Sequence, residues 1–112
     1  MAEVKALLDK YGILREAWNT LPDDRHRLQL LEGLAELENA ESYRTLQFPV
    51  TRFHRAKGVK QTVYRADVDK ISGWRLHLQF DHDGTLCLKD LIPGSRHDDV
   101  TKVVKAKKHR YE

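Results

Sequence analysis

Two stretches of alternating apolar and polar residues, joined by a short turn, constrain the fold more than any other feature of the sequence. In residues 74–80 an apolar side chain occupies every second position. The polar side chains between them are Arg75, His77 and Gln79. Because successive strand residues point to opposite faces, this period predicts a strand with one apolar face. Residues 85–92 repeat the pattern after Asp83-Gly84, a dipeptide that favours a tight hairpin turn.

The residues before this hairpin have the apolar period of helices. Apolar side chains recur every three or four positions in residues 4–18 and again in residues 28–37. Pro22 and Asp23 lie between the two stretches, where a helix stop and a new N-cap are expected. The short connection predicts an antiparallel helical hairpin over residues 3–39.

Residues 44–93 predict a small antiparallel sheet of three to four strands. Residues 62–68 are typical of a strand, whereas Pro49 limits the stretch around it to an edge or broken strand. Residues 54–60 are expected to form a basic loop, and residues 97–109 a C-terminal helix. Helices followed by strands predict an α+β fold in which the helical hairpin packs on one face of the sheet.

Length and composition narrow the class of protein further. A chain of 112 residues suits one domain. It has no apolar run near the roughly 20 residues that cross a bilayer, and its first residues lack the pattern of a signal peptide. The single cysteine, Cys87, excludes an internal disulfide. We therefore expect a cytoplasmic protein with no membrane contact.

The net charge of +3 conceals an asymmetry between the two parts of the chain. Residues 1–40 hold 5 basic and 8 acidic side chains, and residues 41–112 hold 15 basic and 9 acidic ones, which gives −3 and +6. A basic region of this kind suits nucleic acid, although a solvated surface without a partner would have the same composition. The candidate RNA-binding residues are Lys57, Lys60, Lys89, Lys102 and Lys105.

Motifs for phosphate-binding loops, zinc proteases and CxxC metal sites are missing, and the histidines are scattered, so we expect no metal and no cofactor. Cationic and proton-transferring side chains do gather on elements that would be neighbours. The candidate catalytic residues are Arg65, Asp67, Arg75, Arg96, His97, His109 and Tyr111. Cleavage of RNA by its own 2′-hydroxyl needs a base, an acid and cations on the phosphate, and arginine binds phosphate bidentately.

Each of these residues also has a structural interpretation. Arg75 would pair with Asp67 across the strands, and His97 would begin the last helix. The lysines of that helix would form a solvated face.

Three segments resemble the RelE/ParE superfamily of bacterial toxins over about residues 43–112. They are residues 64–68 (YRADV), 72–76 (SGWRL) and 92–96 (IPGSR), followed by a basic C-terminal helix. The resemblance implies a small basic endoribonuclease that cuts messenger RNA on the ribosome and is held inactive by a cognate antitoxin protein. The chain departs from the family pattern, because its sequence predicts a helix at the start where the family has a strand.

The same resemblance implies roles for individual residues. Arg75 and Arg96 fall on the phosphate-facing arginines of the family, and Arg65 on a position that often holds a lysine acting in proton abstraction or charge stabilisation. His109 or Tyr111 falls where relatives place a general acid. Asp67 replaces a cation, so it is a base, a neutraliser of Arg75 or a sign against catalysis.

Two alternative functions stay open from the sequence. A branch of the same superfamily shares the fold but inhibits DNA gyrase or another target without cleaving RNA. A non-enzymatic nucleic-acid-binding module would use the basic face alone.

Overall fold

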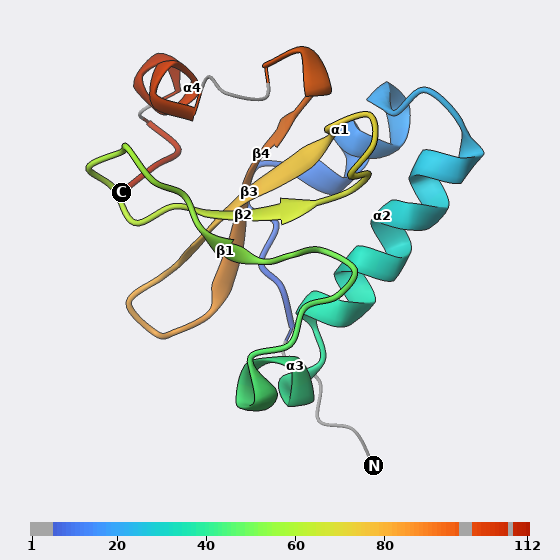
Figure 1. Cartoon of the computed structure of the whole chain (residues 1–112). Helices are drawn as coiled ribbons and strands as arrows, with labels where there is room; N and C mark the ends of the chain where they lie inside the picture. The colour runs from blue at the N-terminus through green and yellow to red at the C-terminus, as the bar shows by residue number, and fades with distance from the viewer. Residues whose placement is uncertain (1–5, 97–99, 108) are drawn as a thin grey trace.

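The computed structural model describes residues 6–96, 100–107 and 109–112. Its elements in chain order are α1 (Ile13–Thr20), α2 (Asp24–Leu37), α3 (Ala40–Thr45), β1 (His54–Arg55), β2 (Tyr64–Asp67), β3 (Arg75–Phe80), β4 (Leu86–Ile92), a 3-10 turn (Gly94–Arg96) and α4 (Val100–Ala106). The strands form one antiparallel sheet in the order β1-β2-β3-β4 (Figure 1). The predicted α+β class with a small antiparallel sheet is thus confirmed.

The central hairpin of β3 and β4 contains an irregularity that the sequence pattern did not reveal. His77 lies opposite Asp90, but the next residue of β3, Leu78, lies opposite Leu88. Lys89 is therefore the extra residue of a β-bulge, which bends the strand and breaks its alternation. The bulge allows the apolar side chains on both sides of it to face the same core.

The N-terminal residues differ from the expected helix. The first helix begins only at Ile13, after Gly12 with a left-handed φ of 68°. The Asp9 carboxylate accepts hydrogen bonds from the first two backbone N–H groups of α1, at 2.7 and 3.0 Å. Before that point Leu8 forms a parallel bridge with Cys87 of β4. The prediction of helix is wrong for residues 6–12, which lie along the outer edge of β4, and residues 3–5 of the expected hairpin lie outside the described residues.

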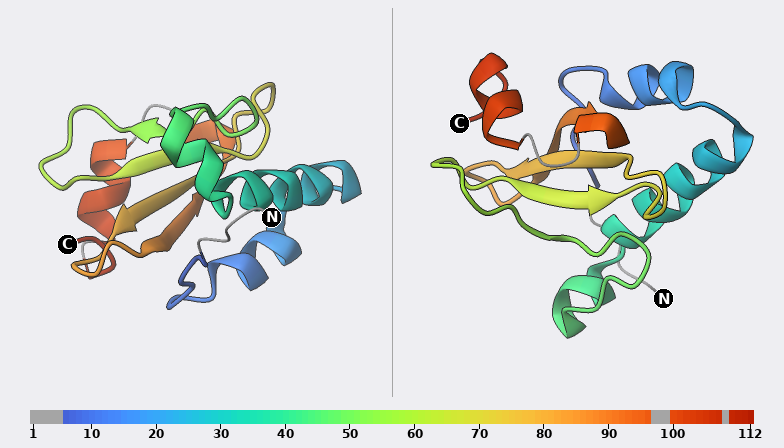
Figure 2. Two further views of the ribbon diagram at one scale, coloured as in Figure 1. Left: turned by 90° about the horizontal axis from the view of Figure 1, so that it is seen from below. Right: turned by 45° about the horizontal axis from the view of Figure 1, so that its top comes forward.

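Helices α1 and α2 diverge from their short connection instead of packing side by side (Figure 2). Helix α1 contacts β4, and the apolar side of α2 joins the same core. Residues 45–53, expected as an edge or broken strand, contain no strand, and Pro49 lies in a turn. The outermost strand is β1, two residues long, within the segment expected to be a loop.

The polar face of the sheet is covered as well as the apolar one. Every residue of β4 is buried, and so is every residue of β3 except the last. On the polar side Val104 and Tyr111 pack against Ala56 and Val63. Helix α4 and the C-terminal residues therefore lie over this face, on the opposite side of the strands from α2 (Figure 1). Within the described residues, the helices are all too short or too polar to cross a membrane.

A polar cluster ties the turn between β2 and β3 to the start of α2. The ring of His26 lies 2.6 Å from the Asp23 carboxylate and 3.0 Å from the Ser72 hydroxyl. This order of Asp, His and Ser matches a nucleophilic triad, but the Ser72 hydroxyl donates to Asp69 at 2.6 Å. The hydroxyl proton of Ser72 is directed at the Asp69 carboxylate and not at the imidazole of His26. We therefore interpret the cluster as a structural contact between the β2–β3 turn and α2.

The Asp69 carboxylate should make the stability of the protein depend on acid pH. The hydrogen bond from Ser72 is the main reason that the pKa of Asp69 falls from 3.8 to about 2. A carboxylate with a lowered pKa stabilises the fold above its unfolded pKa and loses this effect as the pH falls toward its folded pKa. We expect Asp69→Asn to decrease the free energy of unfolding at pH 7 and to flatten its decline between pH 4 and 2. Chemical denaturation at each pH measures this, and the control is Asp24→Asn, which removes a 99% exposed carboxylate from the first turn of α2.

Gly94 has to be a glycine because another part of the backbone approaches it. A Cβ at this position would lie 1.7 Å from the backbone oxygen of Ser72. We expect Gly94→Ala to cost at least the upper end of the about 1–3 kcal/mol typical of overpacking. Gly12→Ala is the matched control, because its Cβ would meet nothing within 4 Å and only its positive φ is strained. Equal losses of unfolding free energy in the two variants would contradict this account.

Candidate active site

Four ionisable side chains, one from each strand, form a single row across the polar face of the sheet. His54 lies opposite Arg65, Arg65 opposite His77, and His77 opposite Asp90. Residues directly opposite each other in an antiparallel sheet share a face, with their Cβ atoms about 4.5–5.5 Å apart. We call these four residues the cross-strand row.

Exposure decreases steadily along the cross-strand row. His54 is exposed and Arg65 is half-buried, whereas His77 is 1% exposed and Asp90 0%. The cause is the covering of the β4 end of the row by α4 and the C-terminal residues. The accessible end of the row is therefore the β1 end.

His77 of the row forms a neutral pair with Tyr111, which comes from the C-terminal residues. The Tyr111 hydroxyl lies 2.8 Å from Nδ1 of His77. Burial, helped by the positive charges of Arg65 and Lys107, lowers the pKa of His77 to about 4. Burial and the negative charge of Asp90 raise the pKa of Tyr111 above its ordinary value of 10. Near neutral pH the imidazole is therefore uncharged and the phenol keeps its proton.

The buried carboxylate of Asp90 is held by cations from the C-terminal segment. Nζ of Lys107 lies 3.0 Å from both carboxylate oxygens, and the guanidinium of Arg110 donates to one of them at 3.2 Å. A carboxylate is buried at a tolerable cost only when it is paired in this way. The positive charges of Lys107 and Arg110 are therefore already paired with Asp90.

Arg65 differs from Arg52, Lys107 and Arg110 in that no carboxylate within the described part of the chain forms an ion pair with it. Its buried Nε, like that of Arg110, has no hydrogen-bond partner there. A guanidinium without a counter-ion is suited to an anion with two oxygens, such as a phosphate. Arg65 is thus the residue of the row best placed to receive an external anion.

In the neighbouring cross-strand pair, Asp67 and Arg75, the carboxylate pairs with a different arginine from the one expected from the sequence. The two residues lie opposite each other in the register, but the Asp67 carboxylate accepts a hydrogen bond from Nε of Arg52 at 2.5 Å. Arg75 is only 2% exposed, and its Nε donates to the backbone oxygen of Gly73 at 3.3 Å. This position inside the protein places Arg75 away from an external ligand.

The remaining candidate residues fall in three groups. Those that are exposed are Lys57, Lys60, Lys102, Lys105 and His109. Lys89 is buried at the bulge, with Nζ 5.5 Å from the centre of the Tyr11 ring. His97 lies outside the described residues, and the side chain of Arg96 is not described either. Of the seven candidate catalytic residues, the structure places Arg65 in the cross-strand row and joins Tyr111 to it through His77.

Three residues of the row, His54, His77 and Asp90, are not among the candidate catalytic residues named from the sequence, and for His54 and Asp90 the pattern did not indicate the polar face either. Asp90 follows the bulge, so simple alternation from Leu88 does not place it on the polar face. His54 is the first residue of β1, a strand of only two residues that is too short to show a period. The signal that would have identified them is the register between strands, which is a tertiary property.

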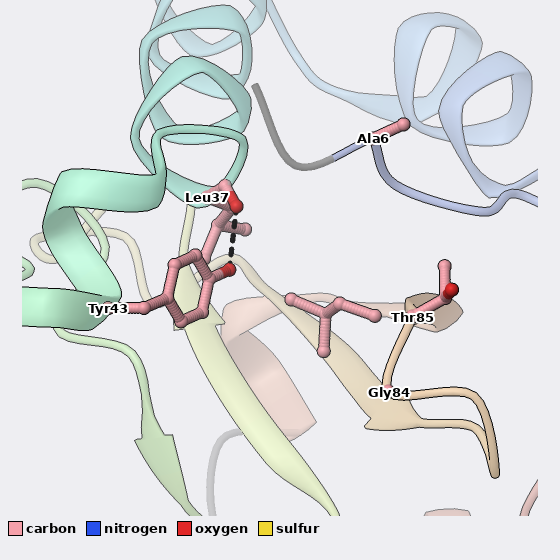
Figure 3. Close-up of a pocket in the computed structure, with 6 residues that line it drawn as sticks. Ala6, Leu37, Tyr43, Gly84 and Thr85 are labelled. Atoms are coloured by element: carbon pink, nitrogen blue, oxygen red, sulfur yellow. Dashed lines mark hydrogen bonds between the residues drawn. The ribbon is translucent and has the colours of Figure 1, made fainter. Parts of the chain in front are cut away.

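A separate hollow of about 300 Å³ lies between α3 and the turn of the β3–β4 hairpin (Figure 3). Tyr43 points into it, but its hydroxyl already donates to the backbone oxygen of Leu37 at 2.6 Å, and burial raises its pKa to about 12. The described lining contains no carboxylate, imidazole or cation. This hollow lacks the groups needed for acid–base chemistry, which the cross-strand row has.

No three His, Cys, Asp or Glu side chains in the described ranges lie close enough together to hold a metal ion. No family model, curated protein or solved structure matches the chain.

The neutral state of His77 can be tested directly by titration. The folded pKa of about 4 lies below the ordinary value of 6.5, so the unfolded chain takes up the proton first as the pH falls. Stability should therefore decline between pH 6.5 and 4, and His77→Gln should remove that part of the decline. NMR of ¹⁵N-labelled imidazole should find His77 uncharged until about pH 4. Titration of this ring near pH 6.5 would contradict the buried His77–Tyr111 pair.

Proposed function

We propose that the protein is a metal-independent endoribonuclease that cleaves single-stranded RNA by attack of a ribose 2′-hydroxyl. The observation that carries this proposal is Arg65, a guanidinium without a counter-ion among the described residues, beside the neutral pair of His77 and Tyr111. A cation for the phosphate and a group that holds a proton at neutral pH are two of the three requirements of this reaction.

Within this proposal Arg65 binds the scissile phosphate and stabilises the charge that develops on it. Tyr111, which is 5% exposed and protonated at pH 7, is the general acid that the departing 5′-oxygen has to reach. His77 orients the Tyr111 hydroxyl through the 2.8 Å contact. The roles implied for Arg75 are revised, because its burial favours support of the turn through Gly73 over contact with phosphate.

The wider setting of the proposal comes from the RelE/ParE resemblance. A toxin of that kind would act on messenger RNA bound to the ribosome and would be inhibited by a cognate antitoxin protein. The exposed lysines, Lys57 and Lys60 next to β1 and Lys102 and Lys105 on α4, supply positive charge on both sides of the row. These charges would attract the phosphate backbone of RNA without regard to sequence.

Replacement of Arg65 tests the proposal. We expect Arg65→Gln to reduce RNA cleavage about 100-fold or more, the usual cost of removing one group that stabilises transition-state charge. Arg44→Gln is the control, because Arg44 is exposed on α3 and paired with Glu41. The assay uses an end-labelled RNA oligonucleotide with EDTA present, and the products should be a 2′,3′-cyclic phosphate and a 5′-hydroxyl.

Other outcomes identify the alternative functions. Binding of RNA without any product would favour a non-enzymatic nucleic-acid-binding module. Growth arrest in cells without cuts in messenger RNA, mapped by primer extension, would favour a toxin with another target such as gyrase. Full cleavage by Arg65→Gln would contradict the role of the cross-strand row.

A further inference from the structure

The proposed reaction also requires a base for the 2′-hydroxyl proton, because the His77–Tyr111 pair is already assigned to the acid. We propose that His54, at the exposed end of the cross-strand row, is this general base, an inference that rests on the proposed ribonuclease function. Four features of its surroundings support the assignment: its place in the row, the orientation of its ring, the residues that hold that orientation, and the charge of the segment around it.

The row places His54 and the proposed acid on opposite sides of the phosphate-binding cation. His54 neighbours Arg65 from β1, and the His77 that holds Tyr111 neighbours Arg65 from β3. In cleavage by a 2′-hydroxyl the attacking and departing oxygens lie on opposite sides of the phosphorus atom. A phosphate held on Arg65 would therefore present one oxygen toward His54 and the other toward Tyr111.

The ring of His54 is oriented by the backbone. Its Nδ1 lies 2.6 Å from the carbonyl oxygen of Arg52. A carbonyl oxygen only accepts hydrogen bonds, so Nδ1 must carry the hydrogen and Nε2 of the neutral ring has the free lone pair. His54 is exposed, which leaves Nε2 available to a ligand. This is the tautomer that a general base on an external substrate requires.

The carbonyl that orients His54 comes from a strained residue. Arg52 has a φ of 48°, in the left-handed region that non-glycine residues seldom adopt. Such a conformation costs of order 1–3 kcal/mol and persists only when its surroundings impose it. The side chain of Arg52 is held by the Asp67 carboxylate at 2.5 Å. Asp67 is thus a positioning residue, which acts on His54 through Arg52.

The segment around His54 is free of acidic residues. Residues 46–66 contain no Asp or Glu, but they hold Arg55, Lys57, Lys60, Arg65 and Arg52, the last of which is paired with Asp67. Arg55, Lys57 and Lys60 are exposed next to His54 in the chain. A base in such a field meets a polyanion at raised local concentration, because the positive potential attracts phosphate groups.

The proposed step balances without an added reagent. Nε2 of His54 takes the proton of the 2′-hydroxyl, and the 2′-oxygen forms a bond to phosphorus. The bond from phosphorus to the 5′-oxygen breaks, and Tyr111 gives its proton to that oxygen. Water then carries the proton from His54 back to Tyr111, so the enzyme is restored and the products are a 2′,3′-cyclic phosphate and a 5′-hydroxyl.

The experiment compares His54→Ala with His82→Ala, which removes an imidazole that is 88% exposed in the β3–β4 turn. We expect His54→Ala to lower kcat about 100-fold or more, the lower end of what general bases contribute. Its Kd for a non-cleavable 2′-O-methyl RNA should stay within about twofold of wild type. Added imidazole should restore part of the rate to His54→Ala and have no effect on His82→Ala.

Asp67→Asn tests the positioning role in the same assay. We expect a lower kcat with unchanged KM, and no additional loss when Asp67→Asn is combined with His54→Ala. A merely structural role for Asp67 would instead add its loss to that of His54→Ala.

The two proposals fail in distinguishable ways. If wild type cleaves RNA and Arg65→Gln is impaired while His54→Ala is not, only the assignment of His54 is overturned. Loss of cleavage in His54→Ala that imidazole does not restore also overturns it. If wild type makes no product, the proposed function and this inference fall together.

Discussion

The burial of Asp90 between Lys107 and Arg110 is the interaction on which the polar half of the structure depends. A fully buried carboxylate is tolerated only with paired cations, and both cations come from the C-terminal segment. The ion pairs therefore hold this segment on the sheet, where Tyr111 reaches His77. In the same position the segment covers β3 and β4, so the polar face of these strands is buried as well as the apolar one.

This arrangement separates the charges of the polar face into two regions. Around Asp90 the cations are compensated within the protein, whereas toward β1 no carboxylate of the described residues forms an ion pair with Arg55, Lys57, Lys60 or Arg65. An external anion gains little from cations that are already paired and much from those that are not. The β1 end is therefore the part of the sheet where binding of RNA is physically most favourable.

The sequence pattern was most reliable where one face of an element is apolar. Alternation over residues 74–80 and 85–92 located β3 and β4, and the Asp-Gly turn between them was correct, with Gly84 at a φ of 81°. It failed where local and tertiary preferences compete. Leu7 and Leu8 fit a helical period, but the backbone of Leu8 forms hydrogen bonds with β4 instead. The helix begins only at Ile13, whose backbone N–H donates to the Asp9 carboxylate. The bulge at Lys89 left no sequence signal.

The sequence by itself determined the α+β class, the central hairpin, the basic character of residues 41–112 and the identity of Arg65 and Tyr111 as candidates. The tertiary structure alone decided that Arg65 stands between two histidines, that Asp67 pairs with Arg52, and that Arg75 is inside. The physical reason is that strand register and ion-pair partners depend on residues distant in the chain. Periodicity reports which side of an element is apolar, but it does not report which polar side chains come to face each other.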